Sequence, residues 1–278
     1  MWGISTLQAY ATINNDTTGL KMNIEPFDQV PLWCFFLLAI ILSMLAVEFG
    51  FRIGGWRHAR GADEKETPVA AMVASVLGLL AFMLAFTFSL AASRFDARRQ
   101  AVLEEANSIG TTYLRTQLLP EPQRSEIIKL LRDYTELRAK KIGRDTVEEL
   151  MNKSDELHKE IWGLAVVAAE KDPHSILTGL FLQSLNETID LHSKRIFVSL
   201  RSQVPLTIWM ALWSLTLIGM VSVGYQAGLS GTRRSPEMPV LALAFAVVLL
   251  LIVDLDRGQE GFLKVSQQSI VDVLKMMK

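Results

Sequence analysis

Long apolar stretches alternate with strongly charged ones along this chain of 278 residues. Four stretches contain no charged residue: 30–47, 67–93, 202–232 and 238–253. A helix needs about 20 apolar residues to cross the hydrocarbon core of a membrane, with a range of about 17–25. The pattern therefore predicts four transmembrane helices, near 31–50, 69–92, 205–226 and 238–256. The apolar runs are too continuous for the alternating strands of a membrane barrel.

The segment between the second and third predicted spans has a different composition. Residues 94–201 hold 17 basic and 17 acidic side chains, so we expect this part to lie in water. Apolar residues at helical spacing nevertheless continue from the second span into it, at Phe95, Val102, Ile109 and Tyr113. We therefore predict that the second helix runs for about 50 residues, from Pro68 to the breaker pair Pro120 and Pro122.

Three more helices are predicted in the charged part, and one amphipathic helix follows the fourth span. They cover 123–142, 145–171, 175–201 and 262–276. The fold class that follows is an all-α integral membrane protein, with a helical bundle inserted between transmembrane helices two and three. The expected division is a polar N-terminal segment (1–29), helices one and two (30–92), the bundle (93–204), helices three and four (205–256) and an amphipathic tail (257–278).

Positive charges beside the spans predict the orientation of the protein in its membrane. Eleven Lys or Arg residues lie at the membrane-proximal ends of the bundle and in the two terminal segments, against six in the loops that join paired spans. This excess predicts that the bundle lies on the cytoplasmic side, although the first loop is itself basic.

Composition and motifs argue against several functions. The net charge of −1 argues against nucleic acid as a partner, and the single cysteine, Cys34, excludes an intrachain disulfide. The sequence contains no P-loop, dinucleotide-binding or zinc-protease motif. Its four histidines, at 58, 158, 174 and 192, are far apart in sequence, and we expect them to be surface or capping residues. We therefore expect no enzyme activity, no cofactor and no bound metal.

Glu48 is the one acid close to the interior of a predicted span. Arg52 follows four residues later and shares its helix face, so an interfacial ion pair is the simpler interpretation. The alternative is a residue on an ion path, because acidic groups inside membranes are usually functional.

The second span carries a regular aromatic stripe. Gly78, Phe82 and Phe86 recur every four residues on one face, and Leu90 and Arg94 continue that face to the end of the span. A pair of phenylalanines in a span usually packs against other helices or faces lipid. If this helix surrounds the axis of an oligomer, the same stripe forms stacked rings of Phe, and such a constriction can gate by dewetting.

The run FMLAFTFSLAASRF (82–95) resembles the pore-lining helix of bestrophin channels, which has a similar Phe-containing core followed eight residues later by an arginine and an aromatic residue. The stretches 94–120 and 254–269 resemble more specifically a bacterial membrane family described as bestrophin-like. This second resemblance covers nearly the whole chain.

The resemblance implies a fold, an assembly and a set of site residues. It implies a homo-oligomer, expected to be a pentamer, in the lipid bilayer of the bacterial inner membrane, with small inorganic ions as the species that it passes. The pore neck would be formed by Phe82 and Phe86, with Gly78 at the upper neck position. The inner pore mouth would lie near Leu90, Arg94 and Arg98.

Three acids of the tail fall where eukaryotic bestrophins carry a run of acids that holds calcium. Asp254, Asp256 and Glu260 are only weak candidates for a metal, because Ca²⁺ takes about six to eight oxygen ligands and Arg257 interrupts the three. We expect these acids to cap helices and to pair with Arg257 or Lys264 instead.

Two functions are compatible with these patterns. The first is an oligomeric ion channel with a hydrophobic neck on the second span. The second is a non-conducting membrane protein whose helical bundle docks a partner or senses stress, which the size and balanced charge of 94–201 would suit. A transporter is less favoured, because we find no inverted repeat and no broken helix within a span.

Overall fold

The computed structural model describes residues 31–60, 66–140, 147–201, 204–231, 237–257 and 261–278. The described residues form eight α-helices and no strand. The helices are α2 (Leu32–Ala59), α3 (Glu66–Thr116), α4 (Gln123–Ala139), α5 (Val147–Lys171), α6 (Ile176–Arg201), α7 (Leu206–Leu229), α8 (Glu237–Asp256) and α9 (Gln268–Met276). The predicted all-α class is therefore confirmed. The polar segment 1–29 lies outside the described residues.

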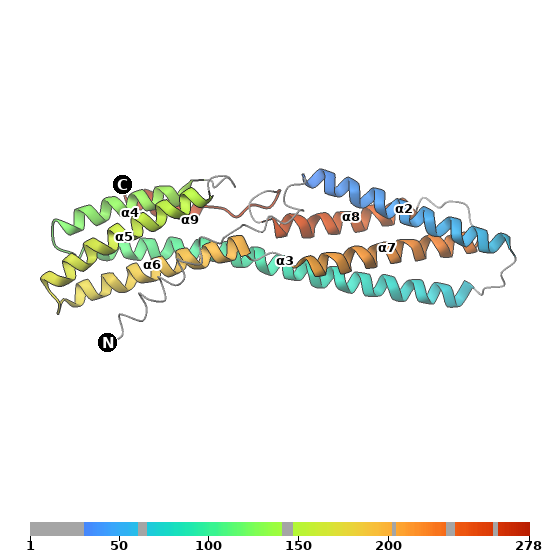
Figure 1. Cartoon of the computed structure of the whole chain (residues 1–278), viewed down its shortest axis with the longest axis horizontal. Helices are drawn as coiled ribbons and strands as arrows, with labels where there is room; N and C mark the ends of the chain where they lie inside the picture. The colour runs from blue at the N-terminus through green and yellow to red at the C-terminus, as the bar shows by residue number, and fades with distance from the viewer. Residues whose placement is uncertain (1–30, 61–65, 141–146, 202–203, 232–236, 258–260) are drawn as a thin grey trace.

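Four of these helices, α2, α3, α7 and α8, are long and apolar enough to cross a membrane. They coincide with the four predicted spans. α2 ends at Ala59 rather than near residue 50, so its last turns, which contain Arg52 and Arg57, lie beyond the predicted span. Figure 1 shows these helices side by side in one half of an elongated molecule, with α4, α5, α6 and α9 in the other half.

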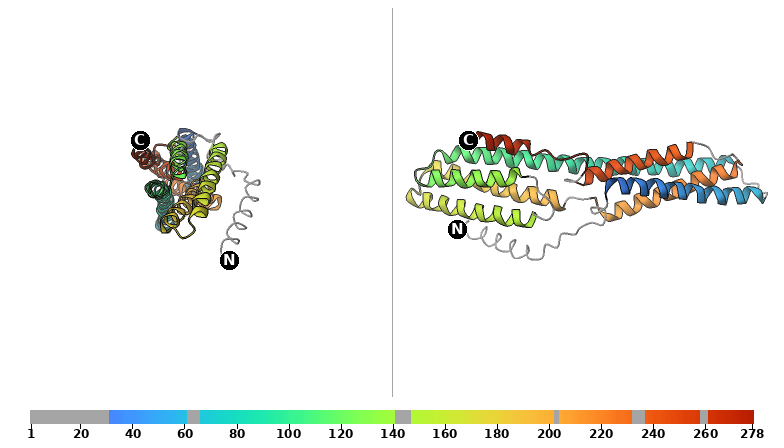
Figure 2. Two further views of the ribbon diagram at one scale, coloured as in Figure 1. Left: turned by 90° about the vertical axis from the view of Figure 1, so that its left-hand side faces the viewer. Right: turned by 90° about the horizontal axis from the view of Figure 1, so that it is seen from above.

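The helix α3 belongs to both halves of the molecule. It runs without interruption for 51 residues, as the continuous apolar stripe predicted, and it ends four residues before Pro120. A helix rises about 1.5 Å per residue, so α3 is about 75 Å long. Figure 2 shows α3 running through both halves when the molecule is seen from above.

Apolar packing holds the half that contains the four membrane-length helices. Leu80 and Leu84 of α3, Leu212 of α7, and Leu249 and Ile252 of α8 are buried in one cluster. Burial of apolar side chains of this size stabilises a fold by about 1.5–3 kcal/mol for each side chain when water is the reference. Within a membrane the contribution comes instead from close packing of the helices.

The helices α2 and α7 approach each other through paired glycines. A Cβ atom at Gly50 would lie 2.0 Å from the carbonyl oxygen of Val221, and one at Gly224 would lie 2.0 Å from the carbonyl oxygen of Val47. Each helix carries a second glycine one turn later, in the sequences GFRIG and GYQAG. Two glycines four residues apart are typical of closely packed membrane helices.

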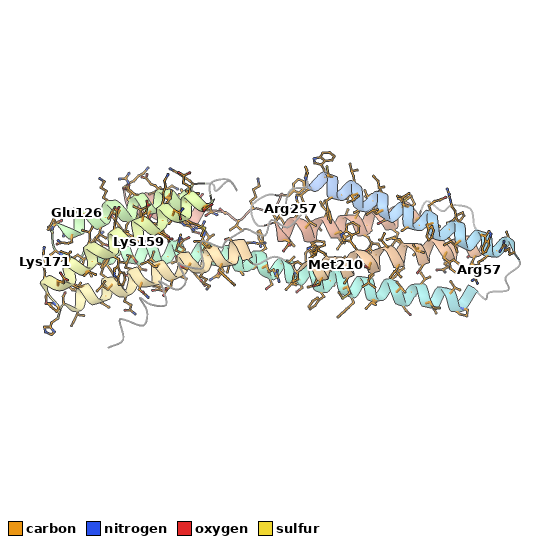
Figure 3. All side chains as sticks on the ribbon, in the orientation of Figure 1. Arg57, Glu126, Lys159, Lys171, Met210 and Arg257 are labelled. Carbon is orange, nitrogen blue, oxygen red and sulfur yellow. The ribbon has the colours of Figure 1, made fainter. Side chains whose placement is uncertain are left out.

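The second half is a helical bundle with its own apolar core and a charged surface. Ile127 and Leu131 of α4, Ile161 of α5, and Phe181 and Leu185 of α6 are buried together. The C-terminal half of α3 packs against α6, α4 and α9. Figure 3 shows the charged side chains of Glu126, Lys159 and Lys171 on this half, whereas Met210 lies among the apolar helices of the other.

The C-terminal tail corrects one expectation. A helix was predicted over 262–276, but α9 begins only at Gln268. The backbone amides of Phe262 and Leu263 donate instead to the two carboxylate oxygens of Asp254, at 2.8 Å and 3.1 Å. A tertiary contact thus replaces the first turn that the amphipathic pattern predicts.

Candidate functional site

The aromatic stripe of α3 lies uncovered within one protomer. Phe82 is 66% exposed and Phe86 is 55% exposed. No described atom outside its own helix would lie within 4 Å of a Cβ at Gly78. The opposite face of the same helix is buried, at Leu80 and Leu84. The structure therefore places the three predicted neck residues together on a face that no other described part of the protomer covers.

The residues predicted for the inner pore mouth do not share that exposed face. Leu90 is half-buried and packs against the apolar cluster of the membrane half. Arg94 is half-buried as well. Arg98 is buried, and its guanidinium donates to the backbone carbonyl of Leu255 at the end of α8. Arg98 thus joins α3 to α8. A role for Leu90, Arg94 and Arg98 at an inner pore mouth stays a prediction.

The tail acids act as acceptors for backbone amides. Asp254 is buried and receives the amides of the tail described above. Asp256 accepts from the amide of Val204, at 2.9 Å, next to the start of α7. These contacts hold backbone amides outside the helices and do not cap a helix, because neither α7 nor α9 has a side-chain cap. The expected pairing of these acids with Arg257 or Lys264 stays a prediction. Glu260 lies outside the described residues. These contacts and that of Arg98 all lie near the end of α8.

Glu48 forms the expected ion pair with Arg52. The two side chains meet at 2.8 Å between Oε1 and Nε, on the exposed side of α2. An exposed pair of this kind contributes about 0–1 kcal/mol. A role for Glu48 on an ion path stays a prediction.

The centre of the bundle contains a buried polar cluster that the sequence analysis did not identify. Glu105 of α3 is fully buried. Its carboxylate accepts from Nε of Arg138 on α4, at 2.9 Å, and from the guanidinium of Arg195 on α6. The hydroxyl of Tyr134 donates to Oε1 of Glu105 at 2.8 Å. One carboxylate therefore holds three helices together.

Two histidines extend this cluster. The rings of His158 on α5 and His192 on α6 lie 5.0 Å apart and nearly perpendicular. Burial lowers the pKa of His158 to about 3, and the neighbouring His192 acts in the same direction. Burial also lowers the pKa of His192, although Glu105 opposes it. Both rings are therefore neutral at pH 7. The expectation that these two histidines lie on the surface is wrong, whereas His58 and His174 are exposed as expected.

A signal for this cluster exists in the sequence. Glu105 lies on the apolar stripe of α3, three residues after Val102 and four residues before Ile109. His158 and His192 also occupy positions at helical spacing from buried apolar residues of their own helices. Polar residues on an apolar helix face indicate buried partners, because an unpaired buried charge is costly. The identity of the partners depends on how the helices pack.

The comparisons with known proteins agree with this architecture. The family model of the Bestrophin-like domain matches residues 35–270. A bacterial bestrophin homologue from Klebsiella pneumoniae has a similar structure, with a TM-score of 0.61 at 14% identity, over 89% of this chain and 97% of that one. A variant of that homologue with one substitution gives a TM-score of 0.62 at 15% identity, over 88% and 97%.

A third similar structure is the crystal structure of a membrane protein with one substitution, with a TM-score of 0.62 at 14% identity, over 88% of this chain and 96% of that one. No curated protein matches the chain at a significant level. At such low identity the solved structures show a shared fold. The family match covers most of the chain, from the first membrane helix to the C-terminal helix. The chain therefore belongs to the bestrophin-like family.

Proposed function

We propose that this protein is an oligomeric ion channel, and that its pore is lined by α3. It passes small inorganic ions and catalyses no reaction. The channel sits in the bacterial inner membrane as a pentamer, as the resemblance to bestrophin channels implies. Phe82 and Phe86 form its hydrophobic neck, with Gly78 one turn further along the stripe.

The composition of the exposed face of α3 carries this proposal. Most of the other exposed side chains beside the aromatic stripe are small, at Ala71, Ala74, Ser75, Ala81, Ala85 and Ser89, whereas Met72 and Leu79 are the large exposed residues that flank it. The exposed side of α2 carries large apolar side chains instead: Trp33, Leu37, Ile41, Leu45 and Phe49. Large apolar residues suit lipid, whereas small residues suit the close approach of another helix. The α3 face is therefore suited to pack against copies of itself around an axis.

The neck carries no charge with which to select an ion. Rings of Phe82 and Phe86 would instead control flux by excluding water from the constriction. Gly78 leaves the pore wider at its own level, because it contributes no side chain. Arg94 is the nearest basic residue on the continuation of the stripe, at the end of the span.

The bundle formed by α4, α5, α6, α9 and the second half of α3 forms the cytoplasmic part of the channel. In the chain order α4, α5 and α6 lie between the second and third membrane helices, α3 and α7, whereas α9 follows α8. The excess of basic residues beside it supports the cytoplasmic side. Arg98 of α3 contacts the end of α8, and Asp254 holds the tail that leads to α9.

The proposal is tested in two steps. The native mass in mild detergent should correspond to five chains. Flux through reconstituted vesicles should then rise in Phe82→Ala and Phe86→Ala, and fall in Gly78→Phe, where the structure leaves room for the new ring. Phe88→Ala is the matched control, because Phe88 is also exposed on α3 but lies off the stripe. A monomer or dimer, or unchanged flux in both Ala variants of a conducting protein, would overturn the neck assignment.

A second candidate function is the docking of a partner by the bundle, without conduction. The bundle exposes apolar side chains near its end, among them Trp162, Ile176 and Leu177. Trp162, Val166 and Leu182 also line a shallow hollow of about 420 Å³. This alternative predicts no flux from purified protein in vesicles, together with an associated protein that is lost in Trp162→Glu.

A further inference from the structure

The buried polar cluster of the bundle ends on a group of three side chains with the chemistry of metal ligands. Asp155 and His158 lie three residues apart on α5, so they share one face. His192 faces them from α6. One nitrogen or oxygen from each of the three residues lies within 4.8 Å of those of the other two. Nε2 of His192 lies 4.0 Å from Oδ1 of Asp155.

Both histidines present a nitrogen that no described group satisfies. Nε2 of His158 and Nε2 of His192 are buried and have no hydrogen-bond partner among the residues that the structure describes. The two side chains are 6% and 2% exposed. Buried polar atoms are nearly always paired, because an unpaired one costs about 1–3 kcal/mol. Two unpaired imidazole nitrogens next to a carboxylate indicate that a cation completes the site.

The hydrogen bonds behind His192 determine which of its nitrogens carries the proton. Tyr134 has one hydroxyl hydrogen, and it donates this hydrogen to Oε1 of Glu105. The hydroxyl oxygen of Tyr134 is then left to accept from Nδ1 of His192, at 3.2 Å. Because Nδ1 is protonated in this chain of bonds, Nε2 keeps a free lone pair, and it lies 4.0 Å from Oδ1 of Asp155.

This arrangement is the usual support of a metal-bound histidine. A ligating His commonly donates its other ring N–H to an oxygen that is itself held by further hydrogen bonds. Here the hydroxyl oxygen of Tyr134 accepts the ring N–H of His192, and Glu105 fixes Tyr134. The charge of Glu105 is in turn matched by Arg138 and Arg195, so the support is rigid and buried on the side away from the ligand atoms.

We propose that Asp155, His158 and His192 form a site for a divalent transition metal, best suited to Zn²⁺. Two imidazoles and one carboxylate are ligands that Zn²⁺ prefers, whereas Ca²⁺ and Mg²⁺ prefer oxygen alone. Zinc bonds of about 2.0–2.2 Å place tetrahedral ligand atoms roughly 3.3–3.6 Å apart, so binding draws these side chains slightly together. The side chain of Asp155 is 50% exposed, which leaves an entry path and a fourth position for water.

The site would link α5 to α6 and so tighten the bundle. This inference is independent of ion conduction, because none of its residues lies in the membrane half. It reverses the expectation that the scattered histidines bind no metal, since the fold brings together two that are 34 positions apart, at 158 and 192.

The experiment uses the full chain in mild detergent, stripped with a chelator and then titrated with ZnCl2 in competition with a chromophoric zinc indicator. We expect one tightly bound Zn²⁺ per chain and a rise of the melting temperature with zinc. Asp155→Asn should weaken zinc binding by about 10- to 100-fold or more, and should abolish the rise in melting temperature. Asp155 is half-exposed, so this variant should fold like the wild type.

Two further variants make the result specific. Glu156→Gln is the matched control, because Glu156 is an exposed acid on the same helix, and it should bind zinc like the wild type. His158→Asn should lose binding together with the visible absorption of a tetrahedral Co²⁺ complex. Equal zinc affinity in wild type and Asp155→Asn, or a folded wild type that binds no zinc in the titration, would overturn the proposal.

Discussion

Asp254 at the end of α8 accepts a hydrogen bond from the backbone amide of Phe262, with 2.8 Å between the oxygen and the nitrogen. The contact is possible because residue 261 is a glycine: a Cβ there would lie 2.0 Å from the same carboxylate oxygen. The tail is therefore attached to the membrane half before it continues to α9 in the bundle.

Asp254→Asn should loosen the tail. The amide keeps the shape of the carboxylate but replaces one acceptor oxygen with an N–H group, which would face a backbone N–H. The cost should be about 1–3 kcal/mol, the penalty of an unsatisfied buried donor. Trypsin should therefore cleave faster after Lys264, which is exposed. Asp272→Asn, at an exposed acid of α9, serves as the control, and equal cleavage rates in the two variants would contradict the anchoring role.

Gly50→Leu should separate α2 from α7. The new side chain would meet the backbone of α7, which cannot move aside like a flexible side chain. The free energy of unfolding should fall by more than is typical of overpacked cores, which is about 1–3 kcal/mol. Gly55→Leu is the matched control on the same helix, since no described atom outside its own helix lies within 4 Å of its Cβ position. The melting temperature of the detergent-solubilised protein, measured by size-exclusion chromatography after heating, should decrease strongly only for Gly50→Leu.

Glu105→Gln should destabilise the bundle strongly. The change leaves the buried guanidinium groups of Arg138 and Arg195 without their counter-charge, and breaking a buried ion pair in this way costs about 3–5 kcal/mol. The neighbouring Glu104 offers a direct comparison, because it pairs with Lys194 at 2.7 Å on the surface. Glu104→Gln should cost only about 0–1 kcal/mol. Similar melting temperatures for the two variants would show that the buried cluster contributes little.

Labelling of single cysteines should establish the orientation of the protein. In a Cys34→Ala background, Lys159→Cys places a thiol on the bundle and Arg57→Cys places one near the far end of α2 (Figure 3). In intact cells, a membrane-impermeant maleimide should react with the second and spare the first, because we propose that the bundle is cytoplasmic. Reaction of Lys159→Cys in intact cells, with none at the other position, would reverse the orientation.

The sequence predicted the elements whose signal is strong and local. The charge-free runs identified all four membrane-length helices, and the stripe from Phe95 to Tyr113 predicted the uninterrupted length of α3. The stripe of Gly78, Phe82 and Phe86 was also found from spacing, and the structure leaves it exposed. These features depend on hydropathy and on the helical repeat, which act within one segment of chain.

The sequence alone did not predict contacts between segments. The helical pattern of 262–276 was correct only from Gln268, because Asp254 binds the amides that the first turn would use. The resemblance to bestrophin channels implies a place for Arg98 near the pore mouth, but its buried contact with Leu255 of α8 depends on helix packing that the sequence does not specify.

Hydrophobicity and helical periodicity are properties of neighbouring residues, so the sequence alone is enough to predict the set of helices, their lengths and their apolar faces. Which buried polar groups meet depends instead on how those helices pack. Glu105, Tyr134 and His192 come from three helices, and their hydrogen bonds exist only once those helices are packed. The physical reason is that a buried charge requires a partner, but the sequence does not specify which distant residue will reach it.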